Sequence, residues 1–214
     1  MRYLIVCGGK IDKEFGLNEI KTDGIDAIIA ADSGMDFLYE NGVTPDIIVG
    51  DFDSATTKAL EFFERKGQTE IHRLNPIKDD TDTEYAIRLA IREGARSIVV
   101  LGATGSRIDH VLGNISLLGI GLESKTDISI IDTNNRIRMA DKPVTIEKSA
   151  QYGRFVSLIA LTDDNEVSLK GFKYPVTDYS FDRFTSLGIS NEIVDDHALI
   201  DIHRGKFIII ESKD

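Results

Sequence analysis

Tryptophan is absent from this chain of 214 residues, and cysteine and proline are scarce, with one Cys and four Pro. The lone Cys7 excludes an intrachain disulfide and provides no cysteine cluster for structural zinc. Long apolar runs are missing too, since no segment approaches the ~18 apolar residues that a membrane helix needs. The apolar stretch at the N-terminus is too short for a signal peptide, so we expect a cytoplasmic protein without membrane contacts.

Positive charge is also in short supply. The chain has 25 Lys and Arg against 36 Asp and Glu, which gives a formal net charge of −11. Nucleic-acid backbones are bound by Lys and Arg, so this balance argues against a nucleic-acid partner. An acidic protein can still bind an anionic nucleotide when metal ions mediate the contact. With 42% hydrophobic and 29% charged residues, the composition is that of a globular protein with a substantial core.

Strands and helices alternate along the first part of the chain. Continuous apolar runs predict buried strands, and apolar residues at helical spacing predict the helices between them. The expected strands are Tyr3–Cys7, Ala27–Ala31, Ile47–Val49, Thr69–Leu74, Ser97–Leu101 and Ile128–Ile131. The expected helices are Met35–Asn41, Lys58–Lys66, Thr83–Glu93 and Ile108–Leu122. This alternation predicts an α/β fold with a mainly parallel sheet and flanking helices.

The pattern changes after about Asp132, where short β-rich runs replace the alternation and no helix is expected. The predicted strands are Ile137–Met139, Val144–Glu147, Phe155–Leu161, Val167–Leu169, Ile193–Ile202 and Phe207–Glu211. Such runs, separated by Gly, Asp and Asn, are typical of an antiparallel β-sandwich or barrel. We therefore predict two domains, residues 1–132 and residues 133–214, joined at the polar cluster Asp132–Asn135.

The segment Pro45–Ser54 contains the first candidate site. The run Ile47–Val49 predicts a buried strand, and Asp51 and Asp53 follow it where a helix is about to begin. In extended backbone two carboxylates two residues apart point the same way, and Mg²⁺, which prefers oxygen ligands, would offset their repulsion. Alternatively Asp53 or Ser54 caps the next helix, which explains one of these residues but not the pair.

Two further motifs follow predicted strand ends. Gly8 and Gly9 come after the first strand, where a backbone without side chains can approach a phosphate closely, although a glycine pair is often just a turn. Asp32, Ser33 and Gly34 follow the second strand. Either they contribute to a ligand site, or Asp32 or Ser33 is a helix cap.

The acidic run Lys78–Glu84 precedes the next predicted helix. Thr81 with Glu84 fits a capping box, so part of the run is structural. Three aspartates within four residues exceed what a cap needs. Asp79 and Asp82 are spaced to lie near one another once a helical turn has begun.

The segment after Leu101 places a glycine loop, a guanidinium and a carboxylate at a helix entrance. Arg107 offers a planar fork for phosphate oxygens, and Asp109 stands two residues further on. His110 is open to two interpretations, an acid or base or a hydrogen bond at the helix start.

All these motifs follow strand ends, and the carboxyl ends of parallel strands meet at one edge of a sheet, where ligands bind. We therefore expect one edge to gather Asp32, Asp51, Asp53, Asp79, Asp82, Arg107 and Asp109. Clustered carboxylates with an arginine suit magnesium-assisted chemistry on a polyphosphate. The sequence contains no Gly-x-x-x-x-Gly-Lys-Ser/Thr motif, no Gly-x-Gly-x-x-Gly fingerprint and no Gly-x-Ser-x-Gly elbow.

Taken together, these motifs resemble the thiamine pyrophosphokinase family in order and spacing. The resemblance covers nearly the whole chain, from Gly8 to about Ile210. It rests on Ala31–Gly34, Pro45-Asp46 with Gly50–Ser54, Lys78–Asp82, Gly105–His110 with Asn114, Gly171–Pro175 and Gly188–Asn191.

The resemblance implies transfer of a pyrophosphoryl group from ATP to the hydroxyl of thiamine, with thiamine diphosphate and AMP as products. Residues 1–132 would be the ATP- and Mg²⁺-binding catalytic domain, and residues 133–214 the thiamine-binding domain. It also implies a homodimer in which each site is shared between the α/β domain of one subunit and the β-domain of the other. Some family members stack a tryptophan on thiamine, and this chain has none.

The same resemblance assigns roles to individual residues. Mg²⁺ would be held by Asp51, Asp53 and Asp79, and the catalytic set adds Asp82, Arg107 and Asp109. The nucleotide would contact Gly8, Gly9, Asp32, Ser33, Gly34, Thr104, Gly105 and His110. Thiamine would contact Ser190, Asn191 and Asp109.

Two alternatives remain open. One is a pyrophosphokinase of the same core that acts on a pterin alcohol, against which the Ser190-Asn191 pair in the β-domain argues. The other is a nucleotide-binding module without turnover, which would not require so many costly carboxylates.

Overall fold

The structure is a computed structural model that describes residues 1–52, 57–75, 80–105 and 107–214. The chain forms two compact units, Met1–Thr133 (unit 1) and Asn134–Asp214 (unit 2), and each is described by itself. Among the helices in the described ranges, none combines the length and apolarity that a membrane span requires.

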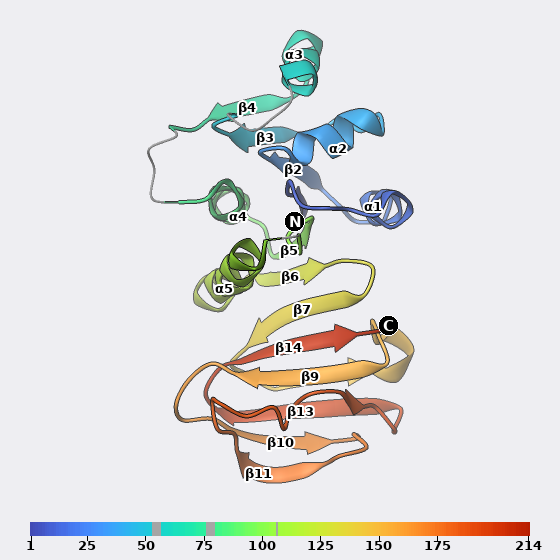
Figure 1. The fold of residues 1–214 in the computed structure, drawn as a ribbon, viewed down its shortest axis with the longest axis vertical. Helices are drawn as coiled ribbons and strands as arrows, with labels where there is room; N and C mark the ends of the chain where they lie inside the picture. The colour runs from blue at the N-terminus through green and yellow to red at the C-terminus, as the bar shows by residue number, and fades with distance from the viewer. Residues whose placement is uncertain (53–56, 76–79, 106) are drawn as a thin grey trace. The chain divides into compact units, whose positions relative to one another are not determined.

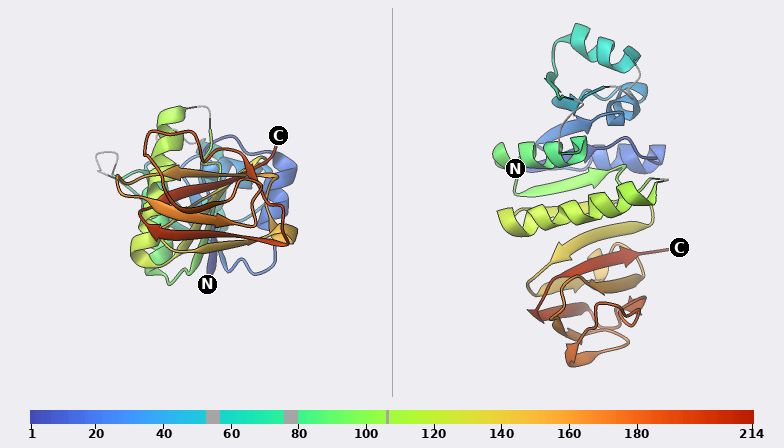
Figure 2. Two further views of the ribbon diagram at one scale, coloured as in Figure 1. Left: turned by 90° about the horizontal axis from the view of Figure 1, so that it is seen from below. Right: turned by 60° about the vertical axis from the view of Figure 1, so that its left-hand side comes forward.

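Unit 1 is an α/β unit whose sheet has the strand order β6-β5-β1-β2-β3-β4, with every neighbouring pair parallel (Figure 1). The strands are β1 Arg2–Val6, β2 Ala27–Ala31, β3 Ile47–Gly50, β4 Glu70–Arg73, β5 Ser97–Leu101 and β6 Asp127–Ile131. The helices are α1 Lys13–Ile20, α2 Gly34–Glu40, α3 Thr57–Lys66, α4 Asp82–Arg92 and α5 Ile108–Ser124. Helix α4 packs on β1, β2 and β3 and lies beside α5 (Figure 2).

The central strands of unit 1 consist of continuous apolar residues because both faces of a parallel sheet are covered. Most residues of β1, β2 and β5 are buried accordingly, whereas the edge strand β4 is polar and partly exposed. The expected parallel sheet and its flanking helices are confirmed.

Helix α1 was not predicted from the sequence. Its capping signal is nevertheless present, since the Asp12 side chain accepts a hydrogen bond from the Phe15 N–H at 2.9 Å. Gly16 lies buried in its middle, and a Cβ there would come within 2.7 Å of the Phe37 ring. Close packing thus requires a glycine at position 16, where the apolar spacing typical of a helix would have a larger side chain. The sequence pattern that predicts a helix is therefore missing from this segment.

Unit 2 contains two antiparallel sheets, with strand orders β12-β9-β14-β7 and β11-β10-β13-β8. The strands are β7 Asn135–Ala140, β8 Val144–Glu147, β9 Phe155–Ala160, β10 Glu166–Lys170, β11 Val176–Ser180, β12 Asn191–Glu192, β13 His197–Arg204 and β14 Phe207–Ser212. Buried side chains from both sheets, such as Val156, Val167, Ile200 and Phe207, form one core. The antiparallel β-architecture expected here is confirmed.

Two predictions for unit 2 were wrong in detail. The run Ile193–Ile202 is not one strand, because the chain leaves β12 and returns only at β13, and the N–H of Val194 donates to the Gly171 carbonyl at 3.0 Å. Strand β11 was missed because its side chains are largely exposed and Asp178 has a left-handed φ of 46°. Its sequence therefore lacks the apolar alternation that reveals a half-buried strand.

Candidate active site

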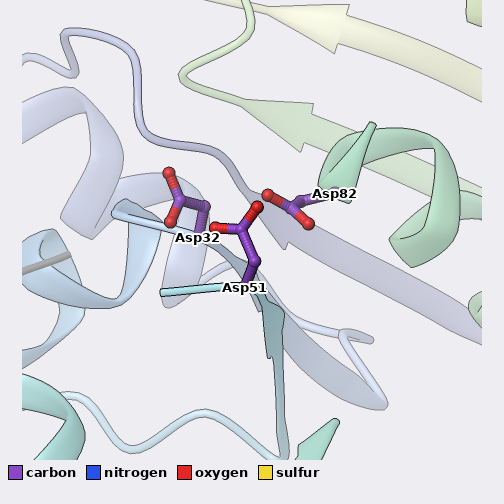
Figure 3. Close-up of side chains that lie close together, drawn as sticks. All are labelled: Asp32, Asp51 and Asp82. Atoms are coloured by element: carbon purple, nitrogen blue, oxygen red, sulfur yellow. The ribbon is translucent and has the colours of Figure 1, made fainter. Parts of the chain in front are cut away.

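Three carboxylates converge at the carboxyl edge of the unit 1 sheet. Asp32 directly follows β2, Asp51 directly follows β3, and Asp82 is the first residue of α4. One oxygen from each lies within 4.8 Å of the others, and Figure 3 shows the three carboxylates grouped together. All three are half-buried, so their mutual repulsion is only partly screened by water.

Tight turns of the backbone bring these carboxylates together. Asp32 has a left-handed φ of 48°, and its N–H donates to the Val49 carbonyl at 2.8 Å, which ties the end of β2 to β3. Gly50 allows this approach, because a Cβ there would lie 3.3 Å from the Cα of Asp32. The turn at Asp32 is therefore held by the neighbouring strand.

The extended backbone expected between Asp51 and Asp53 is not found. Phe52 has a left-handed φ of 63°, so the chain turns directly after Asp51 and strict alternation of side chains does not apply. Asp53 and Asp79, both predicted metal ligands, lie outside the described residues, as does Ser54. Of the three predicted metal ligands, Asp51 is thus the one that lies among the described residues. Its carboxylate is grouped with those of Asp32 and Asp82.

A cavity of about 610 Å³ opens beside these carboxylates in unit 1. Predicted site residues that line it are Gly8, Gly9, Asp32, Ser33, Asp82, Gly105, Arg107, Asp109 and His110. Gly34, Asp51 and Thr104 are not among its lining residues. The edge of the sheet therefore gathers most of the described site residues, as the strand-end rule predicts.

Glycines shape this cavity by letting three loops approach one another. A Cβ at Gly8 would collide with Ser33, and a Cβ at Gly9 would collide with the Gly102 carbonyl. Gly34, the first residue of α2, packs so closely on β1 that a Cβ would collide with the carbonyl of Val6. Gly34 is thus required for packing, whereas Gly8 and Gly9 also contribute backbone to the cavity wall.

Two interpretations of the neighbouring helix starts can now be compared. Ser33 occupies the N-cap position of α2, but its side chain makes no capping hydrogen bond. Thr81 does cap α4, since its hydroxyl accepts from the Glu84 N–H at 3.2 Å. The Glu84 carboxylate pairs with Arg88 at 2.7 Å.

Arg107 and Asp109 form an exposed ion pair at the start of α5. The guanidinium donates to both carboxylate oxygens, at 2.6 and 3.2 Å, and Asp109 also accepts from the His110 N–H at 2.9 Å. The hydrogen bond from Arg107 lowers the pKa of Asp109, and the same bond raises the pKa of Arg107. Both groups therefore stay ionised at neutral pH.

Comparison with known proteins identifies the family to which this site belongs. The family model described as "Thiamin pyrophosphokinase, catalytic domain" matches residues 21–131, and "Thiamin pyrophosphokinase, vitamin B1 binding domain" matches residues 143–207. The thiamine pyrophosphokinase of Bacillus subtilis (strain 168) is 35% identical over 188 residues, 87% of each chain. The chain belongs to the thiamine pyrophosphokinase family.

Solved structures agree with this assignment. The crystal structure of the thiamine pyrophosphokinase from Bacillus subtilis superposes with a TM-score of 0.89 at 31% identity and covers 100% of both chains. The thiamin pyrophosphokinase from Geobacillus thermodenitrificans gives a TM-score of 0.86 at 28% identity, over 100% of this chain and 98% of that one. The family resemblance seen in the sequence motifs is therefore confirmed.

The cavity of this family member also has walls that sequence reasoning missed. They include Cys7, Thr83, Gly102, Ala103, Asn114 and Leu117. Burial raises the pKa of the Cys7 thiol to about 11, against the opposing effect of a 3.4 Å hydrogen bond with Thr83. Cys7 is thus a neutral wall residue and not a nucleophile at neutral pH.

Of the residues predicted to bind thiamine, Asp109 lies in unit 1, and Ser190 and Asn191 lie in unit 2. Ser190 is exposed, has a left-handed φ of 60°, and donates its N–H to the Ser157 hydroxyl at 3.0 Å. The Asn191 side chain is buried, accepts from the N–H of Tyr174 at 3.0 Å and donates to the Tyr174 carbonyl at 2.9 Å. Asn191 therefore holds the backbone beneath the Tyr174 ring, which is 62% exposed.

Proposed function

We propose that this protein transfers the pyrophosphoryl group of ATP to the hydroxyl group of thiamine, giving thiamine diphosphate and AMP. The observation that carries the proposal is the convergence of Asp32, Asp51 and Asp82 beside a glycine-walled cavity of about 610 Å³. Membership of the family supports the choice of substrates, because a relative with 35% identity is named thiamine pyrophosphokinase. The carboxylates and glycine loops suit phosphoryl-type transfer, which depends on positioning and neutralisation of charge.

Mg²⁺ fits the donors at this edge and is part of the proposal. Carboxylate oxygens are its preferred protein ligands, and it usually keeps several of its own waters. Asp32, Asp51 and Asp82 would hold it directly or through those waters, and Asp53 and Asp79 join them on the sequence motif alone. When bound, Mg²⁺ supplies positive charge that offsets the charge of the triphosphate.

The cavity residues of unit 1 would bind and orient the triphosphate. The backbone at Gly8, Gly9 and Gly105 admits phosphate oxygens closely. Arg107 would exchange Asp109 for phosphate oxygens, and this exchange costs little because both side chains of the pair are about two-thirds exposed. Asp109, which keeps its hydrogen bond from the His110 N–H, would orient the thiamine hydroxyl as an acceptor.

In unit 2 we propose that Tyr174 provides the aromatic surface for thiamine in this tryptophan-free chain. The Tyr174 residue is 62% exposed, the Lys173 ammonium lies over its ring at 5.6 Å from the centroid, and Asn191 binds both polar groups of its backbone. Thiamine is cationic, and cations are attracted to the faces of aromatic rings. Asn191 would thus act by holding Tyr174, and Ser190 would offer its exposed hydroxyl to the ligand.

We further propose, from the family resemblance, that the protein is a cytoplasmic homodimer whose site combines the α/β unit of one subunit with the β-unit of the other. Mixing the inactive variant Asp51→Asn with Tyr174→Ala, and assaying the mixture at thiamine concentrations below the wild-type KM, where Tyr174→Ala is impaired, tests the sharing. Random exchange of subunits makes about half the dimers mixed. If each site combines two subunits, every mixed dimer has one site without a substitution. Recovery of about a quarter of the sites supports sharing, whereas no recovery after verified exchange rules it out.

The decisive experiment for the reaction is AMP release from ATP with Mg²⁺, measured with and without thiamine. Thiamine-dependent release, with thiamine diphosphate as the second product, is the expected result. Release that instead depends on a pterin alcohol would favour the pterin pyrophosphokinase. ATP binding without AMP release with either acceptor would favour a nucleotide-binding module.

A further inference from the structure

The loop Gly102–Gly105 leads from β5 towards α5 and forms part of the cavity wall. Three consecutive residues of this loop are each bound to a different element of unit 1. The Gly102 carbonyl accepts from the Gly9 N–H at 2.9 Å, just beyond β1. The Ala103 carbonyl accepts from the Asn114 side chain of α5 at 2.9 Å. The Thr104 hydroxyl donates to the carboxylate of Asp132, directly after β6, at 2.7 Å.

Of these three residues, Thr104 shows most about the role of the loop, because its hydroxyl has a single proton to donate. That proton is donated to Asp132, and the phosphate oxygens of a nucleotide offer no proton in exchange. Thr104 therefore cannot donate to a phosphate while this hydrogen bond exists, and it is not among the lining residues of the cavity. The Thr104 hydroxyl is thus engaged by the protein, and the contact with nucleotide expected for Thr104 from the sequence stays a prediction for its other atoms.

We propose that Thr104 and Asp132 are positioning residues for the nucleotide, acting through the glycine loop and not by contact with ATP. This inference rests on the proposed function, since it assigns the cavity to the triphosphate. A loop fastened in its binding conformation loses less conformational entropy when the ligand arrives. A bond from a neutral hydroxyl to a carboxylate is also stronger than one between neutral groups.

The geometry beside the loop supports this role. Gly102 has a left-handed φ of 69°, and a Cβ there would collide with the Cys7 carbonyl. The loop is therefore closely packed where the Gly102 carbonyl accepts from the Gly9 N–H. Gly105, at the other end, lines the cavity, and Arg107 follows two residues later. The bond between Thr104 and Asp132 lies between these points and holds the loop next to Gly105 of the cavity wall.

The test compares Thr104→Val, which removes the hydroxyl and keeps the shape, with Thr104→Ser, which keeps the hydroxyl. Binding of Mg-ATP is measured by calorimetry, and KM for ATP, KM for thiamine and kcat are measured by AMP release. Thr104→Val is expected to weaken ATP binding at least about tenfold, the scale of a lost hydrogen bond to a charged group. KM for thiamine should change less than about twofold, and Thr104→Ser should remain close to the wild type.

Thr69→Val is the matched control, because Thr69 in the same unit donates to the Pro45 carbonyl at 2.8 Å and lies outside the cavity. It should leave ATP binding unchanged. The single variant Asp132→Ala and the double variant Thr104→Val/Asp132→Ala complete the comparison. The double variant should bind ATP no more weakly than the weaker single variant, because the hydrogen bond that the two changes share can be lost only once.

The proposal is overturned if Thr104→Val binds ATP like the wild type, if Thr104→Ser is as impaired as Thr104→Val, or if the double variant shows additive losses. Calorimetry separates this outcome from failure of the proposed function. Wild-type protein that binds ATP but never releases AMP with thiamine would refute the reaction, while the binding comparison would still decide the role of Thr104.

Discussion

The two units differ in the groups that surround their buried and half-buried carboxylates. In unit 2 the Glu211 side chain is 0% exposed and is bound by Arg136 at 2.6 Å, by Arg138 at 2.8 Å and by the Tyr152 N–H at 3.0 Å. In unit 1 the half-buried Asp32, Asp51 and Asp82 have each other as near neighbours, within 4.8 Å. Glu211 thus has two arginines supplied by the fold, whereas unit 1 brings three carboxylates close together.

This difference separates stability from function. A carboxylate with arginines and an N–H around it is satisfied in the folded state, so its loss should affect folding. Like charges held together raise the free energy of the folded state and are stabilised when a cation binds. Unit 2 therefore uses a buried charge to hold its sheet, whereas the unit 1 cluster is the one that a bound cation would stabilise.

The largest expected effect is on stability, from Glu211→Ala. The substitution leaves Arg136 and Arg138 without their carboxylate, and breaking such a pair costs about 3 kcal/mol, the lower end of the usual range because both arginines are about a quarter exposed. Urea unfolding followed by circular dichroism measures the change. The control Asp163→Asn, which loses an exposed pair with Arg183, should have no measurable effect. Equal stability of the two variants would contradict the comparison.

The next largest effect is on turnover, from Asp51→Asn in unit 1. The substitution removes one carboxylate that would hold Mg²⁺ at the phosphates, and loss of one electrostatic stabiliser typically lowers the rate by about 10²–10³-fold. The unfolding free energy should stay unchanged or rise, because repulsion within the cluster is relieved. Steady-state AMP release and urea unfolding of the same preparation give both values. A large loss of stability in this variant would mean that the unit 1 cluster is structural as well.

A third test concerns Cys7, a neutral group beside the acidic cluster, whose folded-state pKa is about 11 against an ordinary value of 9.0. The unfolded thiol loses its proton first as the pH rises, so the folded state is destabilised progressively between about pH 9 and 11. The full difference corresponds to about 2–3 kcal/mol. Unfolding free energies measured at several pH values should decline less with rising pH for Cys7→Ala than for the wild type. Parallel declines in the two proteins would show that the thiol does not sense this environment.

The smallest effect is expected from Tyr174→Ala. Loss of an aromatic contact with a cation costs about 1–2 kcal/mol, which raises KM for thiamine about five- to thirtyfold. KM for ATP should change little, and Tyr174→Phe should be nearly normal. If Tyr174→Ala leaves KM for thiamine unchanged, then unit 2 contributes to the ligand through some other group.

The positions of Asp32, Asp51 and Asp82 could be predicted because they depend on topology alone. Each lies at a strand end or a helix start, and parallel strands bring their carboxyl ends to one edge. The left-handed backbone at Asp32 and Phe52 could not be predicted, since neither residue type requires it. It depends on contacts with neighbouring strands that a local pattern does not contain.

Roles that depend on distant partners were also beyond the sequence. Thr104 and Asp132 are 28 residues apart, and Asn191 and Tyr174 are 17 apart, so no local spacing reveals their hydrogen bonds. Both Thr104 and Asn191 were expected to face ligands, and the structure shows each bound to another part of the protein. A polar residue beside a candidate site can thus position the site as well as contact a ligand.

The exposed ring of Tyr174 also has a spectroscopic consequence. The chain contains six tyrosines and no tryptophan, so its native ultraviolet emission is that of tyrosine. Tyr174→Trp would introduce one indole, which can be excited selectively over tyrosine, at a single known place in unit 2. Emission from that indole would report the polarity and quenching at this one ring, without any added dye and without interference from the rest of the chain.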